Sequence, residues 1–176
     1  MANGAFLVAE PSFVDILVDD PRVQFLRYSR YCIAILWFSL FTSTDMRIRI
    51  LDDLEGVTHH LPVLFTETEK ARARVAARRG SFLRHFPDEC SAYYDAWQTL
   101  IDGVGEQYLE LEGLEIFGLS PETYQEVLLL NLRAYEEDDL DGWRNLIEQA
   151  GLDFDEEQAM AITGGLDIEE ELIGYD

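Results

Sequence analysis

The chain of 176 residues has the length of one domain, which buries roughly 70% of its unfolded surface and needs no metal or disulfide for support. Hydrophobic residues make up 48% of the composition and aromatic residues 12%, which excludes a wholly disordered chain despite a net charge of −22. Residues 1–84 hold 11 Lys and Arg against 10 Asp and Glu, whereas residues 85–176 hold 2 against 25. The second half therefore lacks the cations that nucleic-acid binding requires, and its acidity indicates either a partner-facing surface or solvated helix faces.

The first third of the chain predicts two strands and a short helix. Residues 5–9, AFLVA, form the first expected strand. Asp20 and Pro21 suit the N-cap and first turn of a helix that runs through Tyr28. Residues 46–50 alternate with a period of two, which predicts a half-buried strand with its arginines on one face and its isoleucines on the other.

The run RYCIAILWFSLFTS, residues 30–43, is the most apolar stretch of the sequence. Ten of the eleven residues in 31–41 are apolar, but a helix that crosses a bilayer needs about 20. We therefore expect this run to be core, with Trp37 or Phe38 reaching a surface, and the pattern leaves helix and strand open. The chain begins without the basic n-region of a secretory signal, which predicts a cytoplasmic location.

A strand and a long helix are expected next. Residues 61–65 form the strand, and Pro62 places it at an edge or at a strand start. Residues 66–69 match a capping box, and the helix that follows ends near Gly80 or continues to Phe86. Its basic residues recur every four positions and predict a solvated face that pairs with the acidic half, or alternatively an anion site. These residues are Lys70, Arg74 and Arg78.

The second half of the chain predicts mainly helices. Residues 87–103 form a helix whose apolar face contains Ala92, Ala96, Trp97, Leu100 and Ile101. Residues 107–119 suit two short strands around a glycine turn, and Ser120 with Pro121 starts a helix that runs to about Tyr135. A further helix, residues 143–150, is capped by Asp141 or Asp139, and another starts at Asp155 and reaches Gly164. The fold class is therefore α+β, one domain over residues 1–176, mainly helical with a small sheet, in which residues 165–176 form a short helix or a frayed acidic tail.

Residues 137–148 resemble a calcium-binding loop. Carboxylates stand at its first, third, fifth and last positions and Gly142 stands at the sixth, but Glu137 replaces the usual aspartate. The alternative is an acidic helix start, which we favour because the sequence contains no sister loop. No spacing of histidine and cysteine predicts zinc; Cys32 and Cys90 are expected to be reduced, buried thiols. No complete catalytic or cofactor motif is present, and we predict neither enzymatic activity nor a bound cofactor or metal.

Three segments carry a resemblance to a known group of proteins: MANGAFLVAE at the start, RYCIAILWFSLF in the middle and YLELEGLEIF late in the chain. Read together, they resemble the small acidic immunity proteins that bacteria encode beside secreted toxins of polymorphic and type VI secretion systems. The resemblance implies a bacterial cytoplasmic protein that neutralises one cognate toxin by binding it. It supplies no catalytic residue to carry over, and the short apolar run and the acidic charge lead us to expect neither a membrane nor nucleic acid as a partner.

An acidic surface suits such a role, because many toxins are basic at their active sites and opposite charge steers association. We expect the partner-binding surface at the acidic segment between two aromatic residues. Its members are Tyr135, Glu136, Glu137, Asp138, Asp139, Asp141 and Trp143. The alternative is a phage-type acidic mimic of nucleic acid that inhibits a DNA-binding nuclease and carries regularly spaced carboxylates. The sequence leaves the oligomeric state and the identity of the toxin open.

Overall fold

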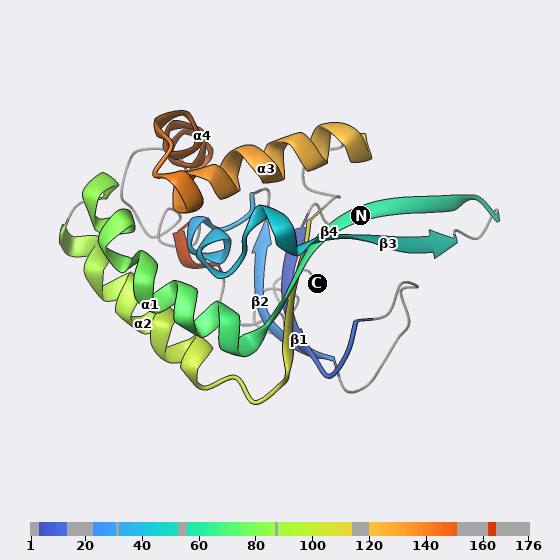
Figure 1. Ribbon diagram of the computed structural model, residues 1–176, viewed down its shortest axis with the longest axis horizontal. Helices are drawn as coiled ribbons and strands as arrows, with labels where there is room; N and C mark the ends of the chain where they lie inside the picture. The colour runs from blue at the N-terminus through green and yellow to red at the C-terminus, as the bar shows by residue number, and fades with distance from the viewer. Residues whose placement is uncertain are drawn as a thin grey trace, which may run out of the picture.

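A computed structural model describes residues 4–13, 23–30, 32–52, 56–86, 88–113, 120–150 and 162–164. Five antiparallel strands form one sheet in the order β2-β1-β5-β4-β3 (Figure 1). The strands are β1 (Gly4–Glu10), β2 (Gln24–Arg30), β3 (Met46–Asp52), β4 (Thr58–Glu67) and β5 (Tyr108–Glu112). The helices are α1 (Thr68–His85), α2 (Ser91–Asp102), α3 (Pro121–Glu137) and α4 (Leu140–Ala150), with short 3-10 helices η1 (Ile35–Leu40), η2 (Ser43–Asp45) and η3 (Asp88–Cys90).

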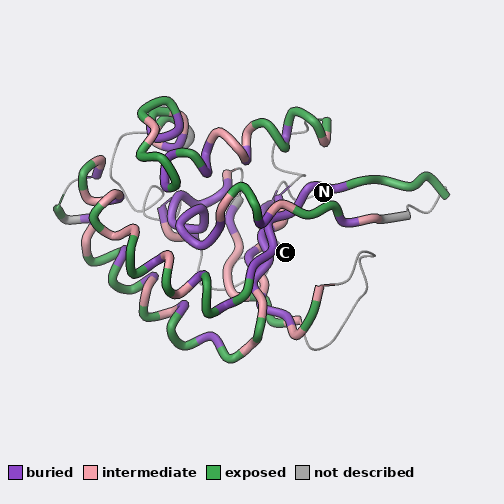
Figure 2. Tube along the Cα trace, in the orientation of Figure 1, coloured by how far each residue is buried: buried purple, intermediate pink, exposed green. Residues whose placement is uncertain are grey.

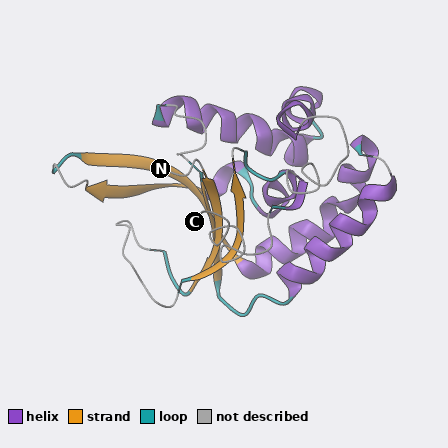
Figure 3. Cartoon of the chain, turned by 180° about the vertical axis from the view of Figure 1, so that it is seen from behind, coloured by secondary structure: helices purple, strands orange, loops and turns teal. Residues whose placement is uncertain are grey.

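The predicted α+β class is confirmed, and the described helices pack on one side of the sheet (Figure 3). Strand residues alternate between the two sheet faces, so Leu7, Leu64 and Leu111 all point toward the helices and are fully buried. The burial colours in Figure 2 follow the same division, with the most continuous buried stretch where the sheet meets the helical layer. The strand expected at residues 5–9 is confirmed as β1.

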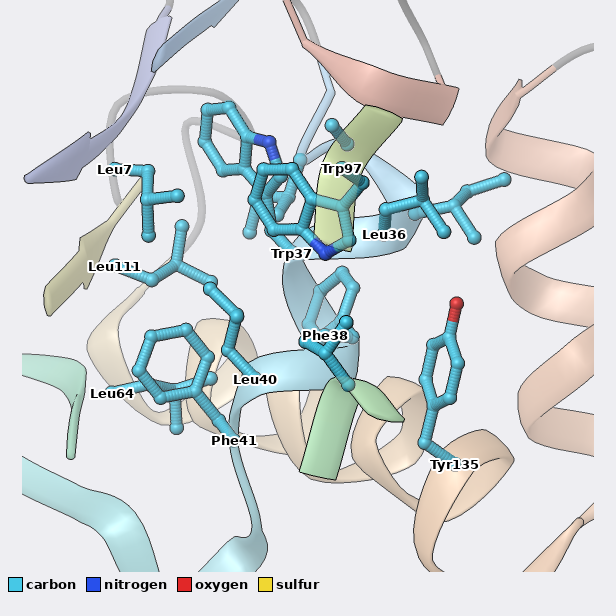
Figure 4. Close-up of a cluster of buried hydrophobic side chains, with 14 of the residues drawn as sticks. Leu7, Leu36, Trp37, Phe38, Leu40, Phe41, Leu64, Trp97, Leu111 and Tyr135 are labelled. Carbon is cyan, nitrogen blue, oxygen red and sulfur yellow. The ribbon is translucent and has the colours of Figure 1, made fainter. Parts of the chain in front are cut away.

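The apolar run forms the centre of this core. Each residue from Ile33 to Phe41 is buried, which confirms the predicted core position, but the backbone is a 3-10 helix over Ile35–Leu40. Trp37 and Phe38 are both 0% exposed, so neither reaches a surface (Figure 4). The polar atoms in the run are satisfied internally: the Trp97 indole donates to the Ser39 hydroxyl at 3.1 Å, and Ser39 donates to the Leu36 carbonyl at 2.5 Å.

Two arginines of α1 bind the buried end of this run. Arg78 Nη1 donates to the carbonyl oxygens of Ser39 at 2.9 Å and Phe41 at 2.6 Å. Arg74 Nη1 donates to the carbonyl of Leu40 at 2.9 Å and forms an ion pair with Asp45 at 2.6 Å. A 3-10 segment that ends inside a core leaves carbonyl groups without helical partners, and these guanidinium groups supply the donors.

The expectation of a solvated basic stripe is therefore wrong for two of its three members. Arg74 and Arg78 point toward the core and pair with backbone and with Asp45, because the carbonyl groups there are shielded from water. Lys70 is the exception, with a side chain 58% exposed beside Glu67. No anion site is needed to explain the spacing of the basic residues.

Two expectations about local structure are also wrong. The helix predicted through Tyr28 is absent over Gln24–Arg30, which is strand β2, because pairing with β1 overrides the weak helix signal at Pro21. Residues 66–69 do not form a capping box: Thr66 belongs to β4, and the first amide of α1, on Thr68, donates to the carbonyl of Gln107 at 2.9 Å. A hydrogen bond to a distant segment of the chain thus replaces the expected side-chain cap.

The half-buried strand predicted over residues 46–50 is confirmed as β3, with its arginines and isoleucines on opposite faces, and the side chain buried at its centre is an arginine. Arg49 is 3% exposed whereas Ile48 is 43% exposed, because β3 extends past the helices and Arg49 pairs with acids on the other sheet face. Pro62 lies in the part of β4 that pairs with β3 alone, as its missing amide hydrogen predicts. Strand β5 confirms the first of the two strands expected in 107–119; residues 114–119 lie outside the described residues.

The helices of the second half agree better with the pattern. Ser120 caps α3 and accepts a hydrogen bond from the Thr123 amide at 3.3 Å, as predicted. In α2, Trp97 and Ile101 are buried as expected, but Ala92 and Ala96 are exposed and Tyr94 is buried in their place. The helix expected from Asp155 and the tail at residues 165–176 fall almost entirely outside the described residues.

We predict that the contacts of Arg78 with the backbone are a major source of stability. Arg78→Met keeps much of the apolar stem but removes the donors, and should lower the free energy of unfolding by about 2–4 kcal/mol, since buried carbonyl groups lose their partners. Urea titration measures the change. Arg79→Met is the matched control: its ion pair with Asp95 is exposed, so the loss should stay below about 1 kcal/mol. Equal losses in the two variants would contradict this role for Arg78.

Candidate partner-binding site at the α3–α4 corner

The acidic segment expected to bind a partner forms the corner between α3 and α4. Asp138 ends α3 in the left-handed conformation, with φ 55°, and turns the chain into α4. Gly142 allows the two helices to cross closely, since a Cβ there would lie 2.7 Å from the Leu130 carbonyl oxygen and 2.8 Å from the Ala134 nitrogen. The glycine that suggested a calcium loop therefore serves helix packing.

Asp138 is a structural connection between this corner and α1. Its carboxylate accepts hydrogen bonds from Ser81 Oγ at 2.9 Å, Arg84 Nη2 at 2.8 Å, His85 Nε2 at 3.1 Å and Trp143 Nε1 at 3.1 Å. Desolvation opposes ionisation of Asp138, but these hydrogen bonds outweigh it and hold the pKa of the carboxyl well below its usual range. The charge of Asp138 is thus engaged within the molecule.

Two neighbouring acids are also engaged internally. Asp139 caps α4 by accepting the Gly142 amide at 2.9 Å and pairs with Arg133 at 3.0 Å, and both contacts lower the pKa of its carboxyl. Of the two caps considered for this helix, Asp139 is the one observed. Glu136 accepts hydrogen bonds from the Ser43 amide at 3.1 Å and the Ser43 hydroxyl at 3.2 Å, which holds the start of η2 against α3.

The two aromatic residues of the segment are core residues. Tyr135 is 5% exposed and Trp143 is 1% exposed, and their rings pack edge to face with centroids 4.7 Å apart. Trp143 also stacks on His85 at 4.7 Å, and the Arg78 guanidinium lies 5.8 Å from the Tyr135 ring centre. Figure 4 draws Tyr135 within the same buried cluster as Phe38. Neither ring is placed to contact another protein.

The exposed part of the corner is smaller than the predicted segment. The side chains of Glu137 and Asp141 are 68% and 70% exposed, and Leu140 between them is 67% exposed. We call these three residues the corner surface. Sequence reasoning missed Leu140, because its helical spacing from Trp143 predicts burial. Leu140 is the first residue of α4 and its side chain remains largely in solvent.

The corner does not form a metal site. Residues 140–150 are helical, so the carboxylates of the calcium-like pattern do not wrap around one point, and Asp139 and Asp141 have protein partners. Across the described ranges, no group of three or more histidine, cysteine or acidic side chains is arranged to hold a metal ion. Cys90 is buried, Cys32 is partly buried, and both are free thiols.

A second cluster of charges lies on the sheet face opposite the described helices. Arg49 forms ion pairs with Glu110 and, at 3.6 Å, with Glu10, and all three side chains are 5% exposed or less. The Phe13 ring lies 5.2 Å from the Arg49 guanidinium carbon. Burial raises the pKa of Glu110 to about 8, although Arg49 acts in the other direction and Glu10 adds to the rise. Among the described residues, two carboxyl groups thus face one guanidinium, and the raised pKa favours the protonated form of Glu110 at neutral pH.

No helix within the described part of the chain has the length and apolar character to cross a membrane. Comparison of the chain with protein-family models, with curated proteins and with solved structures gives no match.

Glu110 should make stability depend on pH. A carboxyl whose pKa is raised by folding stabilises the fold below its unfolded pKa, and this contribution is lost as pH rises through about 8. Glu110→Gln mimics the protonated acid, so its stability relative to the wild type should improve steadily between about pH 4.5 and 8. Glu126→Gln is the control: it removes an exposed carboxylate and measures how the loss of one negative charge alone changes the free energy of unfolding. A Glu110→Gln difference that stays constant across this range in urea titrations would contradict the raised pKa.

Tyr135 provides a test of its position in the core. Its buried hydroxyl has no hydrogen-bond partner among the described residues, so Tyr135→Phe removes a polar group that the core does not satisfy. The variant should be as stable as the wild type or more stable by up to about 2 kcal/mol in thermal unfolding. A loss of stability of similar size would show that the hydroxyl has a partner, such as a buried water.

Proposed function

We propose that this chain is a cytoplasmic immunity-type protein that binds a basic bacterial toxin and neutralises it by occupying part of its surface. The distribution of charge supports the proposal, because 25 of the 35 acidic residues lie in residues 85–176. A protein with this charge repels nucleic acid and other acidic proteins and attracts cationic ones over several ångströms.

The observation that carries the proposal is the corner surface itself. Among the described residues, Leu140 is the most exposed large hydrophobic side chain, and the exposed carboxylates of Glu137 and Asp141 lie on either side of it in sequence. An apolar side chain with a charged rim is the usual arrangement at the centre of a protein interface. The partner that fits it presents an apolar depression surrounded by lysine and arginine.

The remaining charges at the corner do not neutralise this surface. Asp141 pairs with Arg144 at 2.9 Å, and Glu137 lies 3.9 Å from Arg133. Ion pairs between side chains exposed to this extent contribute little free energy, so a partner's cations can replace them at small cost. Glu136, Asp138 and Asp139, by contrast, bind Ser43, α1 and the start of α4, and have no direct role in the proposed contact.

The rival function, a mimic of nucleic acid, requires carboxylates at regular intervals along an exposed face. Helix α3 carries exposed acids at Glu122 and Glu126, but Arg133 interrupts the series before Glu137. This arrangement favours a local contact at the corner over an extended imitation of a phosphate backbone.

The partner to test is the product of the reading frame adjacent to the gene for this chain, as the resemblance to immunity proteins suggests. Leu140→Ala should accelerate dissociation of the purified complex by about tenfold or more, because it removes the apolar anchor. Glu137→Lys combined with Asp141→Lys should slow association by about tenfold at low salt and flatten its salt dependence. Stopped-flow fluorescence measures both rates.

Glu122→Lys combined with Glu126→Lys is the matched control, since it makes the same change in net charge at the other end of α3. Equal effects in both double variants would mean that net charge, and no defined surface, governs association. An unchanged Leu140→Ala complex would remove the corner from consideration. Displacement of the chain from its partner by DNA would favour the mimic.

A further inference from the structure

Strand β3 is an edge strand of the sheet formed by the described residues. Within the described ranges it pairs with β4 alone, and the pairing runs without a shift from Met46 opposite Leu64 to Asp52 opposite Thr58. At the other edge of the sheet, the pairing of β2 with β1 is broken by a shift between Leu7 and Val8. Bulges, prolines, lysines and inward-pointing charges are the usual means of protecting an edge from further pairing; β3 contains no bulge, proline or lysine, and its one buried charge, Arg49, is already paired with Glu110 and Glu10.

The edge is also accessible, because β3 and the outer half of β4 project from the molecule. Strand β5 pairs with β4 only over residues 64–67, so the hairpin extends alone beyond that point. Figures 1 and 3 show this arm reaching well past the rest of the sheet and the helices. Residues 58–60 on β4 are exposed, in agreement with this position.

The side chains of β3 make one face of the edge apolar and the other face basic. Ile48 is 43% exposed, and Ile50 lies on the same face, where the strand has moved past the helices. On the other face Arg47 is exposed, and its Nη1 group donates to the carbonyl oxygens of Thr44 at 3.0 Å and Met46 at 2.8 Å. The charge is thus held beside the beginning of the strand.

We propose that β3 is a docking edge for an extended strand from a different protein, with apolar side chains that cover Ile48 and Ile50 and a carboxylate that meets Arg47. The backbone hydrogen bonds supply affinity, and the two sheet faces supply selection by apolar contact and by opposite charge. This site is distinct from the corner surface: α4 and the arm lie at opposite ends of the molecule in Figure 1.

A second copy of the chain fits the edge poorly. Antiparallel pairing of β3 with itself that sets Ile48 opposite Ile50 also sets Arg49 opposite its own copy, and like charges in that position destabilise a pair of strands. This like-charge contact favours a strand from a different protein.

The test uses three synthetic seven-residue peptides, matched to the length of β3, with the full chain. One alternates isoleucine and glutamate, the second alternates isoleucine and lysine, and the third repeats the first with alternate amides N-methylated. The Ile/Glu peptide should bind and slow hydrogen exchange of β3 amides. The Ile/Lys and N-methylated peptides should each bind at least about tenfold more weakly in calorimetric titrations.

Arg47→Glu should reverse the preference between the Ile/Glu and Ile/Lys peptides, whereas Lys70→Glu, an equal charge change on α1, should not. Circular dichroism establishes that the variants are folded, and the N-methylated peptide tests the edge without altering the protein. Binding that is indifferent to N-methylation or to Arg47, or that leaves β3 amides unprotected, would overturn the proposal. So would a concentration-dependent dimer that protects β3 without peptide, since the occupant would then be a second copy.

Discussion

The fold depends on the contact between two arginines of α1 and the carbonyl groups at the end of the apolar run. The run passes through the centre of the core as a 3-10 helix, and its last carbonyl groups face protein on all sides. Arg78 and Arg74 bind three of these groups, and Arg74 continues to Asp45, which caps η2. One helix thereby fixes the core segment, and the same helix meets α3 and α4 through Asp138.

These contacts divide the charges of the molecule into two populations. One population is structural: the carboxylates of Asp45 and Asp138 pair with α1, and the carboxyl groups of Glu10 and Glu110 lie beside Arg49, which also contacts the Phe13 ring. The other is exposed and includes Glu137 and Asp141 at the corner. Only the second population is free to act on a partner, so the net charge of −22 overstates what any one surface presents. The functional proposal rests on that smaller set together with Leu140.

The sequence predicted those features that depend on local pattern. Ser120 and Pro121 start α3, the apolar stretch AFLVA forms β1, and the apolar run places residues 33–41 in the core. Prediction from the sequence was wrong where a contact with a distant segment determines the structure. Residues 24–30 form β2 because they pair with β1, and Arg49 is buried because it pairs with Glu110 on another strand. The Glu110–Arg49 pair is separated by 61 positions, which no local spacing reveals.

The candidate site, too, was predicted only as far as local pattern determines it. The acidic corner was identified from composition, but the roles of its members were not, because Asp138 finds its partners on α1 and Tyr135 packs beneath Arg78. Leu140 lies three positions before the buried Trp143 in α4 and is nevertheless 67% exposed, so spacing within α4 does not predict its exposure.

The most direct test of the central claim is a growth measurement in which the product of the adjacent reading frame is induced in bacteria with or without this chain. We predict that cells stop growing when the neighbour is expressed alone and grow normally when the chain is co-expressed, and that Leu140→Ala with Glu137→Lys and Asp141→Lys abolishes this protection while the chain remains folded. A neighbour that is harmless, or growth arrest that the intact chain does not relieve, would contradict the assignment as an immunity protein.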